Sequence, residues 1–417
     1  MQGIWARSRG IGQWLTGHAG WCLAVSLAVH VAAVVTHPTH PLDLRVYREA
    51  APHVLSGGLY DYALRTTPPI PRLPFTYPPF AALVFLPLAR LPWAALVALW
   101  QSLSVAALVV VAVCAVRLLG PRPRGRRRAL LWAAAGLWLE PVRHTLDQGQ
   151  VNLLLCAVVL WGLAVPRAAP GRGAGVGLAA AVKLTPAVGG LYLLATRQWR
   201  AAAWAVAAAA AATALAWGVA PRESARYWST LVTDTGRVGP VWSVRNQSLT
   251  GVVARLLGQD TTAAVVLWSV LALVTVALVR ALRSAVRRHD LLGVLVAVEL
   301  YGLLVSPVSW SHHWIWCLPA MIWLAHGPLR HRLLSRVALA WWAVVTVARV
   351  VPYLIGAEDR LVRPGAYPAL LAWPGCVYAG CAVLTLAAVA LRPAGHDRPV
   401  LADGKVPERD RSDVAGG

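Results

Sequence analysis

Charged residues are scarce in this sequence, and acidic residues are scarcer than basic ones. Only 13% of the 417 residues are charged, whereas soluble domains carry about 25%. In contrast, 58% of the chain is hydrophobic, and apolar runs of about 20 residues, each long enough to cross a bilayer, recur from end to end. The composition therefore excludes a soluble protein and predicts an all-α, polytopic integral membrane protein.

Motifs that would hold a metal or a nucleotide are missing. The chain has no Asp-x-Asp pair, which nucleotide-sugar enzymes commonly use to hold a metal on a diphosphate, and no Gly-rich loop of the P-loop type. Its six cysteines lie in apolar segments without metal-ligand spacing, as small core residues do. We therefore expect no metal and no cofactor. A lipid-phosphate sugar would suit such a chain as donor, because its single phosphate can leave without a metal.

The net charge of +22 is carried largely by short loops. Only two of the 39 basic residues are lysine, Lys183 and Lys405, and the arginines cluster between apolar runs. Cytoplasmic loops of membrane proteins show this bias, so the charge predicts topology and not nucleic-acid binding. With the N-terminus inside, the Arg-rich loops and both termini are cytoplasmic. The expected spans, about twelve, are 19–36, 93–117, 129–143, 150–166, 173–183, 186–196, 201–219, 262–282, 291–306, 314–326, 337–355 and 369–391.

Two segments require a choice. Residues 78–91 are apolar but interrupted by prolines, and as a span they would place the arginines of 126–128 outside. We therefore expect them to lie along the outer interface. Residues 173–196 are interrupted by Lys183 and Pro186, so we expect two short helices with an outer turn, which keeps the lysine out of hydrocarbon.

This topology defines two parts of the chain. Residues 1–392 are expected to form one transmembrane domain whose polar, irregular segments gather on the outer side. Residues 393–417 are charged and contain Gly and Pro, which is typical of a disordered tail. Any active site is therefore expected at the outer face.

Asp43 lies a few residues after the first span, which would hold its carboxylate near the outer membrane surface. A carboxylate there can act as general base toward a sugar hydroxyl. It could equally be a helix N-cap, because Arg45, Tyr47 and Arg48 follow. The residue alone leaves both interpretations open.

Polar side chains at two further helix starts could contact a sugar. Tyr77 lies in a proline-rich stretch that could simply be a stiffened first helical turn. Gln148, Gln150 and Asn152 lie at the start of the fourth expected span. They could cap that helix or hydrogen-bond to sugar hydroxyls, and the pattern does not separate the two.

Lys183 is a lone lysine in an apolar run. Such a residue is costly in a membrane and is usually functional, and a phosphate at the outer surface would pair with it as a point charge. The alternative is a lysine that reaches from a helix end to the interface. Two acids, Glu140 and Glu299, also lie near the centres of expected spans, and the pattern indicates no role for either.

Two late outer segments hold the remaining candidates. Asn246 and Gln247 lie in a large outer loop and could be turn residues. Trp310, His312 and His313 lie where a span emerges. Adjacent histidines seldom share one metal, and no third ligand lies at zinc spacing. They could belong to an interfacial aromatic belt, or they could stabilise a leaving phosphate.

Taken in order, these segments resemble a known family. They are similar to the bacterial polyprenyl-phosphate-mannose-dependent alpha-1,2-mannosyltransferases, which are GT-C fold enzymes of glycosyltransferase family 87. Each segment is modest, but all of them occur in the family's order between about residues 40 and 320. The segments are 43–47, 75–79, 149–152, 183–186, 246–248 and 306–313.

The resemblance implies a GT-C helical bundle in the bacterial plasma (inner) membrane with an outward-facing site. It implies inverting transfer of mannose from polyprenyl-phosphate-mannose to a mannose hydroxyl of a glycolipid or glycan, forming an alpha-1,2 link. Asp43 would be the base, and His312 or His313 a site histidine. Lys183 and Arg45 are the expected phosphate-binding residues. The expected substrate-binding residues are Tyr47, Tyr77, Gln148, Gln150, Asn152, Asn246, Gln247 and Trp310.

Two alternatives stay open. The donor could be another prenyl-phosphate sugar, such as arabinose. The chain could also be a lipid or sugar transporter, although transporters often show paired halves with matching broken helices. Here only one broken span is expected, and it has no counterpart in the other half.

The charge-based topology can be tested by cysteine labelling. A membrane-impermeant thiol reagent added from outside should label single cysteines placed at residues 60 and 235, but not at 125 or 285. Labelling at 125 would contradict the interfacial placement of 78–91, because the Arg-rich loop would then be outside.

Overall fold

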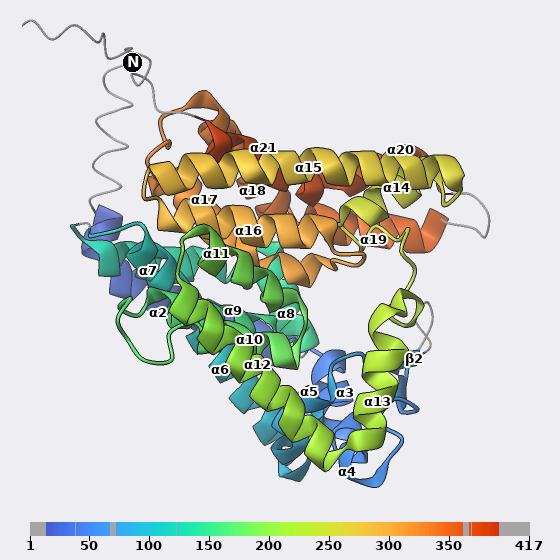
Figure 1. Cartoon of the computed structure of the whole chain (residues 1–417). Coiled ribbons are helices and arrows are strands. Elements are labelled where there is room, and N and C mark those ends of the chain that lie inside the picture. The colour runs from blue at the N-terminus through green and yellow to red at the C-terminus, as the bar shows by residue number, and fades with distance from the viewer. Residues whose placement is uncertain are drawn as a thin grey trace, which may run out of the picture.

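The protein is almost entirely helical (Figure 1). The computed structural model describes residues 14–37, 39–66, 72–121, 123–361, 367 and 369–391. A two-stranded antiparallel ribbon pairs β1 (Ala63–Arg65) with β2 (Arg72–Pro74). The α-helices are α2 (Ala19–Thr36), α3 (Leu42–Ala50), α4 (His53–Ser56), α5 (Pro79–Phe85), α6 (Trp93–Leu118), α7 (Gly125–Gly136), α8 (Glu140–Gln148), α9 (Asn152–Ala164), α10 (Ala174–Val182), α11 (Gly189–Ala195), α12 (Trp199–Val219), α13 (Pro221–Ser229), α14 (Leu249–Leu257), α15 (Thr261–Arg287), α16 (Leu291–Val305), α17 (Cys317–His326), α18 (Leu333–Val347), α19 (Val350–Leu361), α20 (Ala369–Ala372) and α21 (Val377–Ala390). The 3-10 helices are η1 (Leu86–Arg90), η2 (Thr185–Val188), η3 (Leu231–Thr233), η4 (Thr235–Arg237), η5 (Ser311–Trp316) and η6 (Pro374–Cys376).

Several helices are long and apolar enough to cross a membrane. Within the described ranges, α2, α6, α12, α15 and the stretch Leu370–Ala390 meet that test. Two bent pairs raise the total from five to as many as seven: α8 with α9, bent by 118°, and α18 with α19, bent by 52°. The prediction of a helical multi-pass membrane protein is therefore confirmed. The twelve-span topology with both termini inside stays a prediction, and the tail 393–417 lies outside the described residues.

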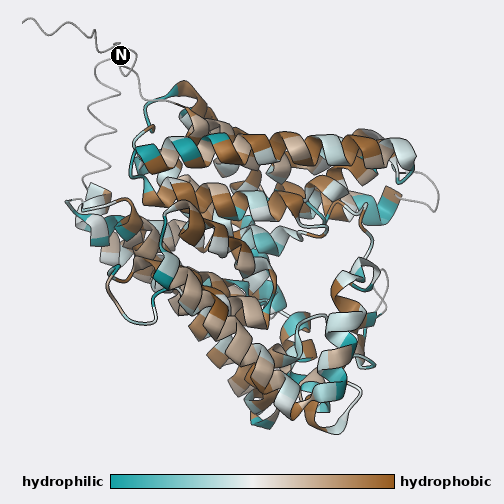
Figure 2. Ribbon diagram, in the orientation of Figure 1, coloured by the Kyte–Doolittle hydropathy of each residue, from teal (hydrophilic) through white to brown (hydrophobic). Residues whose placement is uncertain are grey.

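The helices form two packed groups (Figure 1). One contains α15, α16, α17, α18 and α21, and the other contains α2, α6, α7, α9, α10 and α12. Contacts of η5 with α8 and of α16 with α11 join the groups. Apolar residues run along the long helices, and hydrophilic residues gather at their ends and around α8 (Figure 2).

Small residues allow α10 and α12 to approach closely. A Cβ added at Gly177 would lie 1.9 Å from the backbone oxygen of Ala205, and one added at Gly173 would lie 2.1 Å from that of Ala201. Membrane helices commonly pack through such small-residue faces, because lipid offers no hydrophobic force to drive them together. This contact with α12 fixes the position of α10, which is a short helix that ends at Val182.

The helix break at Lys183 is confirmed. The α10 helix ends one residue earlier, and Lys183 itself has extended backbone angles of φ −149° and ψ 129°. The short η2 helix, with Pro186 in its first turn, then begins at Thr185. Proline cannot continue a preceding helix, since it lacks the N–H. Residues 78–91 also form only short helices, α5 and η1, while their position at the outer interface stays a prediction.

The expected span 129–143 is wrong as a single helix, and so is the mid-span position of Glu140. The α7 helix ends at Gly136, and Glu140 begins a new helix, α8, with a proline at its second position. Proline suits a first helical turn, where its missing N–H would be unpaired anyway. Glu140 is fully buried and accepts a hydrogen bond from the Tyr378 hydroxyl.

Burial adjusts two of the labelling positions given above. Tyr60 and Ala285 are 3% and 0% exposed, so a thiol there would react slowly on either side of the membrane. Leu55 (61% exposed) and Arg287 are better sites in the same two segments. In a cysteine-free background, we expect an impermeant reagent to label position 55 and not position 287.

Candidate functional site

Most of the candidate residues meet where five irregular segments converge. These are the start of α3, the proline-rich stretch before α5, the turn from α8 to α9, the break between α10 and η2, and the 3-10 helix η5. Each segment departs from regular helix, so each can direct polar side chains inward. The residues brought together are Asp43, Tyr47, Tyr77, Gln150, Asn152, Lys183, His312 and His313.

Gly149 allows two of these segments to touch. It caps α8 with a left-handed backbone, φ +66°. A Cβ at this position would lie 2.6 Å from the Cβ of Leu44 and 2.8 Å from that of Pro41. Only glycine combines this conformation with such a close approach, and the contact places the start of α3 directly against the α8–α9 turn.

Asp43 does not act as a helix cap. The N-cap of α3 is Pro41, and no side chain caps the helix. The half-buried Asp43 carboxylate instead lies next to the Gln150 side chain. The Oε1 atom of Gln150 accepts from the hydroxyls of Tyr47 at 3.0 Å and Tyr77 at 3.2 Å. Because both tyrosines occupy the carbonyl end of this amide, its NH₂ group is left to donate to Asp43.

Burial raises the pKa of the Asp43 carboxyl above its usual range, while the Gln150 hydrogen bond and the positive charge of Lys183 act in the opposite direction. A carboxylate with a raised pKa is a better proton acceptor once the pH is above that value. Base activity at this position is therefore lost as the pH falls through the raised pKa.

Lys183 is held by two polar partners. Its Nζ donates to Oδ1 of Asn152 at 2.8 Å and lies 3.0 Å from Nε2 of His313. It also lies 5.3 Å from the ring centroid of Tyr77, within cation–π range. An ammonium group has three N–H donors, so one is left for a ligand. Asn152 does not cap α9, since no side chain caps that helix.

Backbone contacts fix η5 against the α8–α9 turn. The carbonyl of His312 accepts from Oγ1 of Thr145 at 3.0 Å and from Nδ2 of Asn152 at 3.1 Å. Both ring nitrogens of His312 and Nδ1 of His313 are buried with no hydrogen-bond partner among the described residues. Burial lowers the pKa of both histidines well below the usual range, and the charge of Lys183 adds to this. Both rings are therefore neutral at physiological pH.

Glu299 lies behind this cluster. The acid comes from α16, is 3% exposed, and its Oε1 has no hydrogen-bond partner among the described residues. A cavity of about 30 Å³ is lined by Glu299, His313 and Asn152, among others. That volume suffices for a water molecule, so the acid is placed to reach His313 through water.

Several predicted site residues lie apart from the cluster. Arg45 is exposed and pairs with Glu49 at 2.7 Å; it is two residues from Asp43, and such residues face different sides of a helix. The amide nitrogen of Gln148 lies 3.4 Å from Nε2 of His144. The indole ring of Trp310 packs against Gly239, and a Cβ added at Gly239 would lie 3.1 Å from that ring.

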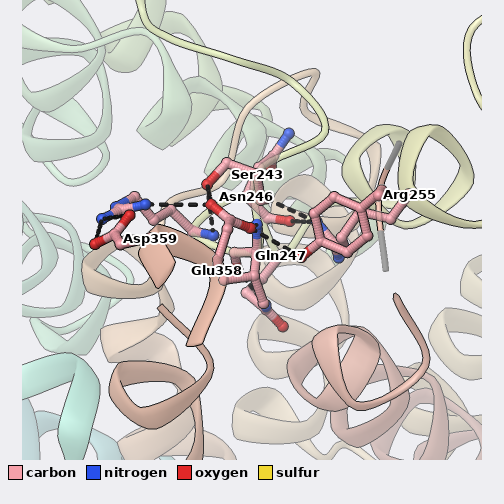
Figure 3. A network of polar contacts seen from close by, with 9 residues as sticks. Ser243, Asn246, Gln247, Arg255, Glu358 and Asp359 are labelled. Atoms are coloured by element: carbon pink, nitrogen blue, oxygen red, sulfur yellow. Dashed lines mark hydrogen bonds and ion pairs between the residues drawn. The ribbon is translucent and has the colours of Figure 1, made fainter. Parts of the chain in front are cut away.

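Asn246 and Gln247 are used internally (Figure 3). The NH₂ of Asn246 donates to the carbonyls of Val241 and Pro307, and that of Gln247 donates to those of Val244 and Gly375. Both amides are 0% exposed. The structure therefore gives both residues a role in holding the 240–248 loop against η5 and the stretch before α21.

Glu358 fixes the same loop from α19. Its Oε1 accepts from Oγ of Ser243 at 2.6 Å and from Nη1 of Arg245 at 3.2 Å, and its Oε2 accepts from the N–H of Val244 (Figure 3). Arg245 also pairs with Asp359 at 2.8 Å. These contacts fix the 240–248 loop in place beside η5.

Sequence reasoning missed His144. Its Nδ1 lies 2.6 Å from Oγ of Ser311, and its ring lies 5.0 Å from that of His312. The signal available in the sequence was its position four residues before Gln148, which places both on one face of a helix.

Comparison with known proteins identifies the family. The family model described as "Glycosyltransferase family 87" matches residues 75–307. The chain belongs to glycosyltransferase family 87. The matched range includes Tyr77, Gln150, Asn152 and Lys183, and Asp43 and the two histidines lie outside it.

Similar curated proteins come from mycobacteria. A polyprenol-phosphate-mannose-dependent alpha-(1-2)-phosphatidylinositol pentamannoside mannosyltransferase of Mycolicibacterium smegmatis is 39% identical over 377 residues, which are 89% of this chain and 91% of that protein. One of the same description from Mycobacterium tuberculosis (strain CDC 1551 / Oshkosh) is 40% identical over 84% of this chain and 81% of its own length. A phosphatidylinositol mannoside mannosyltransferase of M. tuberculosis (strain H37Rv) is 35% identical, covering 81% of this chain and 84% of that protein.

Among solved structures, ArnT from Cupriavidus metallidurans, crystallised with undecaprenyl phosphate, aligns at a TM-score of 0.37 and 18% identity. The alignment covers 90% of this chain and 78% of ArnT.

The electrostatics of Asp43 predict a stability effect. A carboxyl whose folded pKa is above its unfolded value costs folding free energy at neutral pH, where it must be charged. Asp43→Asn removes that cost, so the variant should unfold at the same temperature as the parent or higher. Thermal unfolding in detergent, followed by tryptophan fluorescence, measures this.

Asp290→Ala is the matched control for that measurement. Asp290 caps α16 through the N–H of Gly293 at 2.9 Å and accepts from Nε1 of Trp323 at 2.8 Å. Losing the cap alone should cost about 1 kcal/mol, so this variant should unfold at a lower temperature. A drop for Asp43→Asn as large as the drop for Asp290→Ala would mean that Asp43 holds the fold together.

Proposed function

We propose that this glycosyltransferase transfers mannose from polyprenyl-phosphate-mannose to a mannose hydroxyl of a phosphatidylinositol mannoside. The transfer inverts the anomeric carbon, forms an alpha-1,2 link, and occurs at the outer face of the bacterial plasma membrane within a GT-C bundle. The family and the names of the relatives support the donor and acceptor classes. The observation that carries the chemistry is the half-buried Asp43 carboxylate beside a lysine with one free N–H.

Asp43 is the proposed general base. The acceptor hydroxyl gives its proton to the Asp43 carboxylate as its oxygen attacks the anomeric carbon. The bond from that carbon to the phosphate oxygen breaks, and its electron pair leaves with the phosphate. One carboxylate is enough for this reaction, because the attacking group comes from the acceptor and the phosphate is a good leaving group. Gln150, held by Tyr47 and Tyr77, orients the base.

Lys183 is the proposed phosphate-binding residue. Negative charge grows on the phosphate as the bond breaks, and a preorganised cation in a dry site stabilises it strongly. Asn152 and His313 hold the ammonium in place before the donor arrives. The unpartnered ring nitrogens of His312 are available as further contacts. Arg45, Gln148 and Trp310 are proposed only as contacts at the edge of the substrate.

The decisive experiment is reconstitution. Purified protein in liposomes is supplied with radiolabelled polyprenyl-phosphate-mannose and phosphatidylinositol mannosides of increasing length, and the linkage is read with an alpha-1,2-specific mannosidase. Mannose transfer sensitive to that enzyme is expected. Transfer from prenyl-phosphate arabinose in place of mannose, or no transfer with any acceptor, would contradict the proposal.

Asp43→Asn should abolish turnover while leaving donor binding intact. The amide keeps the shape of the carboxylate but cannot accept a proton, and loss of a general base costs roughly 10²–10⁴-fold in rate. Asp61→Asn is the matched control, since Asp61 is an exposed outer-loop acid paired with Arg226 at 2.7 Å. Near-normal transfer by Asp43→Asn in the liposome assay would place the base elsewhere.

Lys183→Ala should weaken donor use, and Lys183→Arg should retain part of it. Arginine keeps the positive charge, but its planar group cannot reproduce the geometry between Asn152 and His313. Initial rates measured against donor concentration separate the two variants. Unchanged donor kinetics in the alanine variant would remove Lys183 from the phosphate site.

A further inference from the structure

A second, arginine-rich cavity lies at the other end of the bundle. Its volume is about 410 Å³, within the range of small-molecule pockets, roughly 300–1,000 Å³. The loops that follow α6, α9 and α15, together with the start of α16, form its walls. Its polar lining consists of Arg117, Arg167, Arg172, Arg288, His289 and Asp290.

The cavity and the transferase site lie at opposite ends of two helices, α9 and α16. Asn152 of that site begins α9, whereas Leu163 and Ala164 at the end of α9 line the arginine-rich cavity. Leu291 begins α16 at this cavity, and Leu303 near its end lines the small cavity beside His313. The 13 residues of α9 rise about 20 Å. If the transferase site faces outside, this cavity lies toward the inner side of the membrane.

The charge of the lining is strongly unbalanced. Four guanidinium groups face a single carboxylate, Asp290, which pairs with Arg288 at 3.7 Å, caps α16 and accepts from Trp323. Arg117 and Arg167 are exposed and have no hydrogen-bond or ion-pair partner among the described residues. Positive charge in cytoplasmic loops is ordinary, but here the concave lining keeps a net positive charge, which attracts anions.

Arg288 and Arg172 are fixed by protein contacts, so their charges in the cavity lining are held in place. The Nη1 and Nη2 atoms of Arg288 donate to the carbonyls of Leu391 and Val389 at 2.8 and 2.9 Å, and Nη2 lies 3.7 Å from Oδ2 of Asp290. The Nε atom of Arg172 donates to Oε1 of Gln198 at 2.7 Å.

His289 follows the end of α15 and has a left-handed backbone, φ +54°, as is common where a helix ends. The N–H of His289 donates to the carbonyl of Val286, and that of Asp290 donates to the carbonyl of Ala285, both at 3.0 Å. This conformation makes the tight turn from α15 to α16 and puts His289 in the cavity lining.

We propose that this cavity binds a phosphate-bearing anion. Guanidinium groups match phosphate oxygens in geometry and charge, and Leu118, Leu119 and Leu291 add an apolar wall for the carbon skeleton. The phosphate can belong to the headgroup of an anionic lipid or to a free phosphate compound. The site is separate from the sugar-transfer site and does not depend on the proposed donor or acceptor.

Binding measurements on the purified full-length protein test this. Native mass spectrometry with phosphatidylglycerol, and calorimetry with inorganic phosphate and glycerol phosphate, are the two arms. The probe variant is Arg117→Gln/Arg167→Gln, which removes the two exposed guanidinium groups of the cavity. The matched control is Arg126→Gln/Arg127→Gln, which removes the same charge from exposed positions outside the cavity lining. Because all four positions are exposed, both variants should fold.

At least about tenfold weaker binding is expected for the probe variant, with the control unchanged. If only phosphatidylglycerol binds, the phosphate belongs to a lipid headgroup. If inorganic phosphate competes for the cavity, the phosphate belongs to a free compound. Either result supports the proposal. Equal losses in both variants would show only general attraction by basic loops and would overturn it. Absence of binding in both arms would overturn it as well.

Discussion

The Lys183 side chain connects the segments of the candidate site. Lys183 bonds to Asn152 and to His313 at 2.8 and 3.0 Å, and so ties the break in α10 to the start of α9 and to η5. An unpaired charge in this environment would be very costly, and these two contacts reduce that cost. They leave one N–H of the ammonium group for a ligand.

Irregular backbone is tolerated here because protein surrounds it. In lipid, unpaired N–H and C=O groups are too costly, and broken helices survive only where other helices or a cavity satisfy them. The backbone carbonyl of His312 shows how this is achieved, since Thr145 and Asn152 both donate to it. Glu358 does the same for the late outer loop through Ser243 and Val244. The polar groups that support the site are therefore also those that permit its irregular shape.

The two ends of the bundle carry different chemistry on shared helices. At one end of α9 and α16, a carboxylate and a single held cation suit a transfer reaction in a largely dry site. At the other end, several guanidinium groups face an open cavity, which suits binding of an anion without chemistry. The helices α9 and α16 fix the distance between the two.

Composition and residue order alone predicted a helical membrane protein and the break at Lys183, because burial cost and proline chemistry act locally. They marked several residues of the cluster as candidates, whose joint role came only from the resemblance to a family. They could not separate a cap from a base at Asp43, since that depends on whether Gln150 or a helix N–H is within reach. They also could not exclude internal roles for Asn246 and Gln247, or reveal His144. These outcomes depend on contacts between residues distant in sequence, and only the tertiary structure decides them.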